Sequence, residues 1–343
     1  MKPARVTLIP GDGVGPEITG SVRTVLERAG AAITWDEQLG GKAAVVACNN
    51  PIPDTLLASI KKNKIALKGP LETSIGVGYR SVNVTLRKYF DLYANLRPVR
   101  SLAGVKSAFS GVDLIVVREN TEDLYSGIEH IIAPGVVESV KVITARASKR
   151  IAKFAFELAT REKRKTVTAI HKANIMKLSD GLFLDCARQI AKGYPKVTYR
   201  ELIVDNACMQ LVLRPQEFDV LLLENLYGDI VSDLCAGLIG GLGLAPGANF
   251  GANTAVFEPT HGSAPKYTGQ NKVNPMAMML SGMLMLRHLD EGAAAGRLEH
   301  AIAEIIADGK SVTYDMKPTR DDPTAVGTSE VADAIIEKLE VLP

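Results

Sequence analysis

Two aspartates, Asp229 and Asp233, stand four residues apart just after a short apolar run at positions 220–223. The run predicts a buried strand, and the apolar pattern after Gly228 predicts a helix. Residues four apart leave the same face of a helix, and the helix N-terminus favours negative charge. Two hard oxygen ligands on a rigid element suit Mg²⁺ or Mn²⁺. Acids at this spacing are more often a solvated face, but the apolar and Gly-rich flanks disfavour that explanation here.

A second group of residues suits anion binding. Ser81 and Asn83 stand near the start of a predicted helix, with Arg87 further along it. Arg97 follows in the next segment, and Arg118 ends an apolar strand, where side chains of α/β sheets often line a ligand crevice. Each arginine alone is better explained by a structural ion pair. Together, their forked guanidinium groups indicate a small acid with several carboxylates.

The first Gly-rich loop, residues 10–17, follows a strand and opens a helix, as in dinucleotide-binding domains. Pro16 occupies the position of the third glycine in that fingerprint, however. Asp36 lies at a plausible distance for the ribose-binding acid, but one acid near a strand end is common. We therefore expect a tight turn where the backbone passes close to another segment.

Strand-like and helical patterns alternate along the chain, which predicts an α/β fold with mainly parallel strands covered by helices. Residues 128–132 and 136–143 flank a Pro-Gly pair and predict a hairpin that leaves the main body as an arm. The predicted strands cover residues 5–9, 33–37, 65–67, 114–117, 166–170, 198–204 and 220–223. The predicted helices cover residues 17–29, 53–60, 82–89, 148–160, 180–191, the segment after 228, 275–286, 292–308 and 328–338.

The composition is that of an ordinary globular protein. The 343 residues carry a formal charge of +2 without a long basic run, so no nucleic-acid partner is expected. The four cysteines form no metal-binding spacing and predict buried thiols in a reducing compartment. The apolar run at residues 275–286 is too short to cross a bilayer, and no signal peptide is recognisable, so we expect a cytoplasmic protein without membrane contact.

Several motifs in order resemble the isocitrate/isopropylmalate dehydrogenase family, the metal-dependent β-decarboxylating dehydrogenases. The motifs cover residues 9–17, 68–71, 91–98, 118–122, 171–174, 225–233, 258–265 and 274–275. The resemblance implies a non-Rossmann fold with a large domain from residues 1–98 and 240–343. It also implies a small domain from residues 99–239, whose hairpin at about 124–145 would clasp the partner in a homodimer.

Within this family, the residue types in the segment beginning at Ser81 indicate which substrate is bound. Ser81, Asn83 and Arg87 are similar to the isocitrate enzymes, whereas isopropylmalate enzymes carry leucines here. The resemblance therefore implies isocitrate, with Arg87, Arg97 and Arg118 on its carboxylates. Homoisocitrate stays open, because one methylene changes binding by only about 1–3 kcal/mol.

The resemblance also implies the roles of the catalytic groups. Asp229 and Asp233 would bind Mg²⁺ or Mn²⁺ from one subunit, and Asp205 from the other. Lys172, also from the other subunit, would accept the hydroxyl proton, and an arginine-rich pocket favours a neutral lysine. Tyr125 would protonate the enolate left by loss of CO₂.

The cofactor is expected to be NADP, with NAD as the alternative. Lys266 and Tyr267 stand where NAD enzymes of the family usually carry Asp-Ile, and they offer a cation and a hydroxyl to a 2′-phosphate. Against NADP, the arginine expected after Tyr314 is replaced by Pro318. The implied cofactor contacts are Glu72, Thr73, His261, Gly262, Ser263, Ala264, Pro265, Lys266, Tyr267, Asn274 and Tyr314.

Two other functions remain open. A non-catalytic partner subunit could share this fold, although each matched position carries the catalytic residue type. A Mg²⁺-dependent phosphohydrolase could use Asp229 and Asp233, but it would leave Tyr125 without a role.

Overall fold

The structure is a computed structural model that describes residues 3–72 and 81–342. Its strands are β1 Ala4–Ile9, β2 Ile33–Glu37, β3 Ile65–Lys68, β4 Ala94–Arg100, β5 Asp113–Glu119, β6 Glu129–Ala133, β7 Val136–Ser139, β8 Thr166–His171, β9 Thr198–Ile203, β10 Val220–Leu223, β11 Pro246–Phe250 and β12 Ala255–Pro259. Its helices are α1 Gly15–Arg28, α2 Lys42–Cys48, α3 Asp54–Asn63, α4 Val82–Tyr89, α5 Ala145–Arg161, α6 Ser179–Ala191, α7 Val204–Leu213, α8 Asn225–Leu238, α9 Met276–His288, α10 Gly292–Asp308 and α11 Thr328–Val341. None of these helices combines the length and apolar character needed to span a bilayer.

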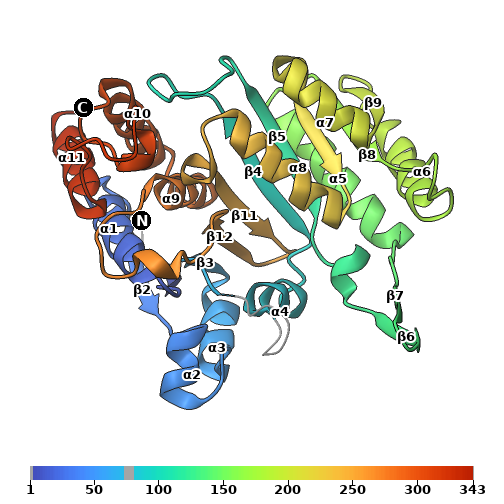
Figure 1. Ribbon diagram of the computed structural model, residues 1–343, viewed down its shortest axis with the longest axis horizontal. Helices are drawn as coiled ribbons and strands as arrows, with labels where there is room; N and C mark the ends of the chain where they lie inside the picture. The colour runs from blue at the N-terminus through green and yellow to red at the C-terminus, as the bar shows by residue number, and fades with distance from the viewer. Residues whose placement is uncertain (1–2, 73–80, 343) are drawn as a thin grey trace.

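One sheet of ten strands runs through the molecule (Figure 1) in the order β2-β1-β3-β12-β11-β4-β5-β10-β8-β9. Both wings are parallel, while β12, β11, β4 and β5 pair antiparallel at the centre. The α/β class and the mainly parallel pairing predicted from the sequence are confirmed.

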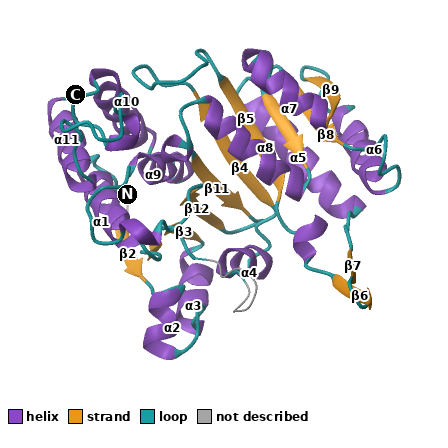
Figure 2. Cartoon of the chain, in the orientation of Figure 1, coloured by secondary structure: helices purple, strands orange, loops and turns teal. Residues whose placement is uncertain are grey.

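Helices cover both faces of the sheet (Figure 2). The alternation of side chains along β10 shows why its four residues are all apolar. Val220 and Leu222 pack in the core that contains α5 and α6, whereas Leu221 and Leu223 pack in the core that contains α7 and α8. Both cores therefore hold β10, and with it the start of α8, in place.

The two chain ends lie in the same half of the molecule, where α1 packs against α11 (Figure 1). The hairpin β6–β7 projects from the other half, as predicted, and its strands turn between Ala133 and Val136. Both observations agree with the expected large and small domains, but the sheet is continuous, so the domain boundaries stay a prediction.

Several strands and helices of the structure were not predicted from the sequence. Strand β4 pairs with both β5 and β11, although Asn95, Arg97 and Pro98 all disfavour a strand. Strands β11 and β12 and helices α2 and α7 were also not predicted. Of the four cysteines predicted to be buried, Cys186 and Cys235 are buried and Cys208 is partly buried, whereas Cys48 is exposed because it ends the short helix α2 at the surface.

Candidate active site

Two arginines from β4 and β5 reach the same face of α8. Arg97 donates to Asp233 Oδ1 at 3.0 Å and lies 3.5 Å from Asp229 Oδ1. Arg118 donates to Asp229 and, at 2.6 Å, to Oδ1 of Asn225. The two aspartates therefore leave one face of the helix, as their spacing predicted.

Gly228 allows this close approach. A Cβ atom at this position would lie 2.4 Å from Cγ of Arg118, which no side chain tolerates. Arg118 runs across α8 here and is only 1% exposed. The glycine of the Asn-Leu-Tyr-Gly-Asp motif is thus explained by the arginine that crosses the helix.

Tyr125 lies in a 3-10 turn, Asp123–Ser126, and its hydroxyl donates to Asp229 Oδ2. The guanidinium of Arg118 sits 5.0 Å from the centre of its ring. Burial raises the pKa of Tyr125, and the bond to Asp229 raises it further. The phenol is therefore held protonated beside the arginine pair, as an acid must be before it gives up its proton.

The charges at this site shift each other's titration. Burial acts to raise the pKa of Asp229, but Arg118, Tyr125 and Arg97 together lower it. The pKa of Asp233 is raised, mainly by burial. Burial and the nearby Arg87 lower the pKa of Arg118 to about 10. The site thus holds ionised Asp229 among a surplus of guanidinium groups, which suits a ligand with several carboxylates.

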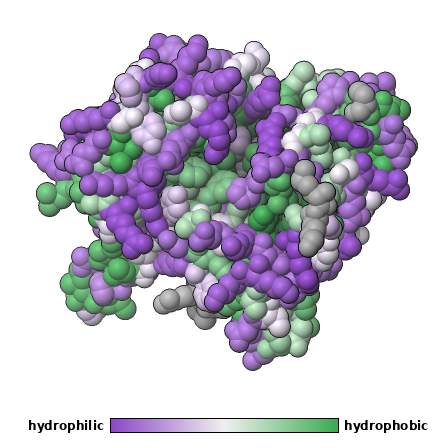
Figure 3. All heavy atoms as spheres, turned by 180° about the vertical axis from the view of Figure 1, so that it is seen from behind, coloured by the Kyte–Doolittle hydropathy of each residue, from purple (hydrophilic) through white to green (hydrophobic). Residues whose placement is uncertain are grey.

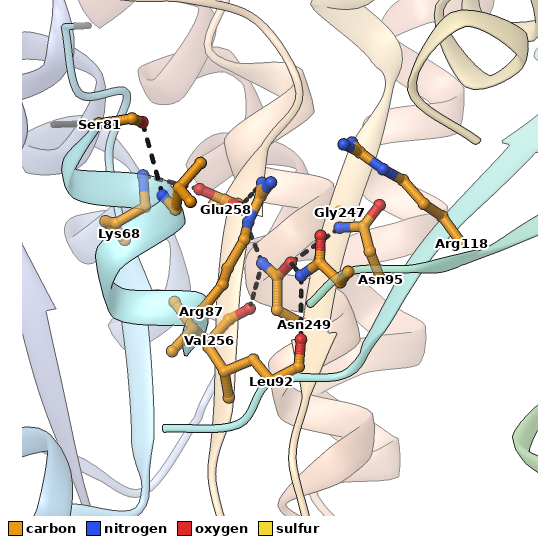
Figure 4. Close-up of polar contacts among 12 residues, drawn as sticks. Lys68, Ser81, Arg87, Leu92, Asn95, Arg118, Gly247, Asn249, Val256 and Glu258 are labelled. Carbon is orange, nitrogen blue, oxygen red and sulfur yellow. Dashed lines mark hydrogen bonds and ion pairs between the residues drawn. The ribbon is translucent and has the colours of Figure 1, made fainter. Parts of the chain in front are cut away.

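A buried network supports Arg87 (Figure 4). Glu258 accepts from Lys68 Nζ at 2.7 Å, from Arg87 Nη2 at 3.0 Å and from Nδ2 of Asn249 at 2.8 Å. Asn249 in turn accepts from Asn95 at 2.9 Å. Burial alone would raise the pKa of Glu258, but Lys68 and Arg87 hold it far below its usual range.

We expect Glu258→Gln to lower the free energy of unfolding by about 3 kcal/mol, because it leaves Lys68 buried without its countercharge. The depressed pKa adds stability above the unfolded value of about 4.3, and this part is lost as pH falls through the folded value. Below about pH 4, the free energy of unfolding of the variant should therefore depend less on pH than that of the unmodified chain. Urea unfolding at several pH values measures both effects.

The control is Glu299→Gln, since Glu299 also contacts two cations, Arg100 and Arg287, but at the surface. It should cost less than about 1 kcal/mol. Equal costs for the two variants would contradict the role of burial.

A cavity of about 120 Å³ lies beside this network. Its lining includes Asn83, Arg87, Arg97 and His261. Among the described residues, Asn83 Oδ1, the Nε atoms of Arg87 and Arg97, and His261 Nε2 are buried without a hydrogen-bond partner. Unpaired buried polar atoms gathered at one cavity indicate a polar ligand. Ser81 caps α4 at the edge of the site, where its hydroxyl accepts from Val84 N at 3.5 Å.

Lys172 and Asp205 form a separate pair. Lys172 follows β8, and its Nζ donates to Asp205 Oδ2 at 2.8 Å, which lowers the pKa of Asp205. The Asp205 side chain is 68% exposed. Within residues 3–72 and 81–342, no three acidic, His or Cys side chains are grouped to hold a metal ion. One chain therefore does not bring Asp205 to Asp229 and Asp233.

The predicted cofactor loop packs against the first Gly-rich loop. Val14 N donates to Ser263 O at 3.0 Å. Gly13 has φ +60°, and a Cβ there would lie 2.1 Å from the same oxygen. The tight turn expected from the sequence is confirmed, and it is the predicted cofactor loop that passes close to it. His261 Nδ1 lies 3.0 Å from Gly262 O, and burial lowers the pKa of His261.

Cations gather at the far end of this loop. Lys266 Nζ lies 4.8 Å from the ring centre of Tyr267, and Lys272 Nζ lies 4.9 Å from that of Tyr314. The two rings are 6.1 Å apart. Ala264 and Pro265 connect this cluster to Ser263. The cluster can hold an anionic group between its two lysines.

Two further predicted cofactor residues make contacts within the protein. Asn274 donates to Asp315 Oδ2 at 3.1 Å, and Glu72 pairs with Lys42 at 2.7 Å. Thr73 lies outside the described residues.

A larger cavity, about 600 Å³, lies away from this site. Leu96 and Pro98 of β4 line it, whereas Asn95 and Arg97 of the same strand point to the opposite face. Figure 3 shows a hollow with hydrophobic residues at its centre on the rear of the molecule. This cavity contains none of the predicted site residues.

The sequence did not predict the buried side chains that hold Arg87 in place. Lys68 and Glu258 belong to motifs that carried the family resemblance, but no role was predicted for them. No sequence pattern predicted a role for Asn249, because its hydrogen-bond partners come from distant parts of the chain.

Comparison with known proteins agrees with the motifs. The family model for isocitrate/isopropylmalate dehydrogenase matches residues 5–335. A probable isocitrate dehydrogenase [NAD] subunit alpha, mitochondrial, from Caenorhabditis elegans is 51% identical over 92% of this chain and 88% of its own. A chloroplastic 3-isopropylmalate dehydrogenase from Solanum tuberosum is 52% identical over 89% of this chain and 86% of its own.

Among solved structures, the isocitrate dehydrogenase from Methylococcus capsulatus superposes with a TM-score of 0.94. It is 50% identical and covers 98% of this chain and 99% of its own. The cytoplasmic location expected from the sequence is contradicted by the Caenorhabditis elegans relative, which is named as a mitochondrial protein. NADP finds no support in the relatives' names either, since that relative is an NAD enzyme.

Proposed function

Because the chain belongs to the isocitrate/isopropylmalate dehydrogenase family, we propose that it oxidises and decarboxylates isocitrate to 2-oxoglutarate and CO₂, with NAD⁺ as the hydride acceptor. Overall identity does not choose the substrate, because the isopropylmalate relative is as similar as the isocitrate relatives. The observation that carries the choice is Asn83, whose buried amide oxygen lines the cavity beside Arg87. An amide at this place suits a carboxylate-bearing substituent, to which its Nδ2 can donate, and opposes an isopropyl group.

The three arginines would bind the substrate carboxylates. Arg97 and Arg118 already face the carboxylates of α8, and Arg87 lies at the wall of the cavity. All three are fixed by further contacts, so little side-chain entropy would be lost on binding. Ser81, at the start of α4, would complete this side of the substrate site.

Asp229 and Asp233 would hold Mg²⁺ or Mn²⁺, with Asp205 from a second subunit. The donors fit, since hard carboxylate oxygens are what these ions prefer and two of them share one helix face. When bound, the ion would stabilise negative charge that develops on the substrate oxygen.

Lys172 and Tyr125 would move the protons. The Lys172 amine would accept the proton of the C2 hydroxyl as hydride leaves C2 for the nicotinamide. After CO₂ is lost from the β-keto acid, the Tyr125 hydroxyl would donate a proton to the carbon that carried it. Lys172 would reach this site from a second chain, since its own chain pairs its Nζ with Asp205.

A homodimer would bring Lys172 and Asp205 to the partner's α8. Large apolar side chains are exposed on the hairpin and on α7 and α8, which fits burial in a second copy. The exposed residues are Ile131, Ile132, Val136, Val137, Met209, Val212, Leu213 and Ile230. Ile131 is 80% exposed, and burying so large an apolar side chain against a second copy would be favourable.

NADP is kept as a second candidate cofactor because of the cation cluster at Tyr267 and Tyr314. The relatives' names favour NAD, but Lys266 and Lys272 could bind a 2′-phosphate. We expect Lys266→Asp with Tyr267→Ile to change the ratio of kcat/KM for NADP⁺ over NAD⁺ by at least about a hundredfold toward NAD⁺, since an acid there repels the phosphate.

Initial rates with each cofactor, before and after the double substitution, give this ratio. Lys153→Ala is the control, because Lys153 is an exposed cation on α5 that pairs with Glu157 and belongs to another part of the fold. An unchanged ratio in the double variant would place cofactor choice elsewhere.

The test of the proposed function is the initial rate of the purified chain on isocitrate with Mg²⁺ and each cofactor. Homoisocitrate and 3-isopropylmalate serve as control acids, and EDTA should abolish the rate. A rate only with a control acid would overturn the substrate, whereas inactivity with all three would favour the non-catalytic subunit.

A further inference from the structure

A buried ionic cluster lies behind the candidate active site and is not explained by the proposed reaction. Lys141, in the segment between β7 and α5, has its Nζ 2.6 Å from both Asp180 Oδ1 and Glu224 Oε2. Its ammonium also lies 4.6 Å from the ring centre of Tyr227. Asp180 is fully buried and Glu224 is 1% exposed. Such a cluster is costly to bury, which suggests a positional role.

Each carboxylate of the cluster leads to a different part of the catalytic machinery. Asp180 Oδ2 accepts from the backbone N–H of Lys172 at 2.7 Å. Glu224 immediately precedes α8, the helix that carries Asn225 and Asp229. The side chain of Lys141 therefore joins the backbone of the proposed base to the start of the proposed metal-binding helix.

We propose that Asp180 is a positioning residue for Lys172, held in place by Lys141 against the start of α8. The inference rests on the proposed function, because it needs Lys172 to act as the base. In a homodimer Lys172 would serve the partner's site while α8 serves its own. The Lys141 cluster would then also fix the two active sites relative to each other.

The two carboxylates use their oxygens differently, and this gives a matched test. Asp180 accepts through both oxygens: Oδ1 accepts from Lys141 and, at 3.2 Å, from Ser179 Oγ, and Oδ2 accepts from Lys172 N. An amide has only one accepting oxygen, so Asp180→Asn must break one of these bonds. Glu224 accepts through Oε2 alone, and its Oε1 has no partner among the described residues.

Glu224→Gln can therefore keep its bond to Lys141. Burial raises the pKa of Glu224 to about 8, so a neutral amide disturbs the cluster less here than at a carboxylate with an ordinary pKa. The two variants make the same carboxylate-to-amide change beside the same lysine, but only Asp180→Asn interrupts the chain of bonds from Lys141 through Asp180 to Lys172 N.

The experiment compares kcat, the KM for isocitrate and the stoichiometry of isocitrate binding in the presence of Mg²⁺. We expect Asp180→Asn to lower kcat at least about tenfold, because a small misplacement of a catalytic group is costly. Its KM and binding stoichiometry should stay near those of the unmodified chain, since the arginines are untouched. Glu224→Gln should keep kcat within about threefold, with the same KM.

Equal kcat losses in the two variants, or an unchanged kcat in Asp180→Asn, would overturn the inference alone. Inactivity of the unmodified chain on isocitrate would overturn the proposed function and this inference with it. If Asp180→Asn does not fold, as judged by its binding stoichiometry, Lys141→Met breaks the same link from its other end. A wild-type kcat in a folded Lys141→Met variant would then overturn the inference.

Discussion

Replacing Lys172 by methionine is expected to lower kcat on isocitrate by about a thousandfold, within the range that general bases contribute. Methionine keeps the length of the side chain but cannot accept the hydroxyl proton. The KM for isocitrate should change little, because Arg87, Arg97 and Arg118 keep their contacts. A loss confined to kcat identifies an interaction made during the reaction rather than in binding.

The free energy of unfolding should also change little on this substitution. The partner of Lys172 is Asp205, whose side chain is 68% exposed and can be hydrated when the pair is broken. Lys177→Met, at an exposed lysine on the same segment, is the control and should leave kcat unchanged. If Lys172→Met kept its kcat within about tenfold, Lys172 would have no part in the proton transfer.

The sequence predicted local geometry well at this site. Asp229 and Asp233 share a helix face because their spacing is close to the helical period. Arg118 reaches the site because it ends a buried strand, where the sheet presents side chains to a crevice. In both cases the signal itself lies within one element, the spacing on a helix or the end of a strand, so the sequence pattern is sufficient.

Long-range support could not be predicted. Arg87 and Glu258 are 171 positions apart, and no spacing in the sequence joins them. Strand β4 was missed for a related reason. Its Asn95 and Arg97 line the cavity of the candidate site, and polar residues at such positions weaken the local signal for a strand.

Two variants that are each inactive alone are expected to give an active enzyme when they are combined in one dimer. Asp229→Asn should also abolish turnover, since it removes a proposed metal ligand and the carboxylate that Arg118 and Tyr125 contact. If each site takes Asp229 from one chain and Lys172 from its partner, a mixed dimer of the two variants has one intact site. The second site of that dimer carries both substitutions.

Random assortment makes half of the dimers mixed, and each mixed dimer has one working site of two. Co-expressed Lys172→Met and Asp229→Asn chains should therefore recover about a quarter of the unmodified activity, as expected for a two-fold symmetric dimer. Tags of two kinds isolate the mixed dimer, whose kcat per dimer should be about half of the unmodified value. The structure gives the reason to expect this, because one chain keeps the Lys172–Asp205 pair apart from the carboxylates of α8. An isolated mixed dimer without activity would instead assign Lys172 and Asp229 to the same chain's site.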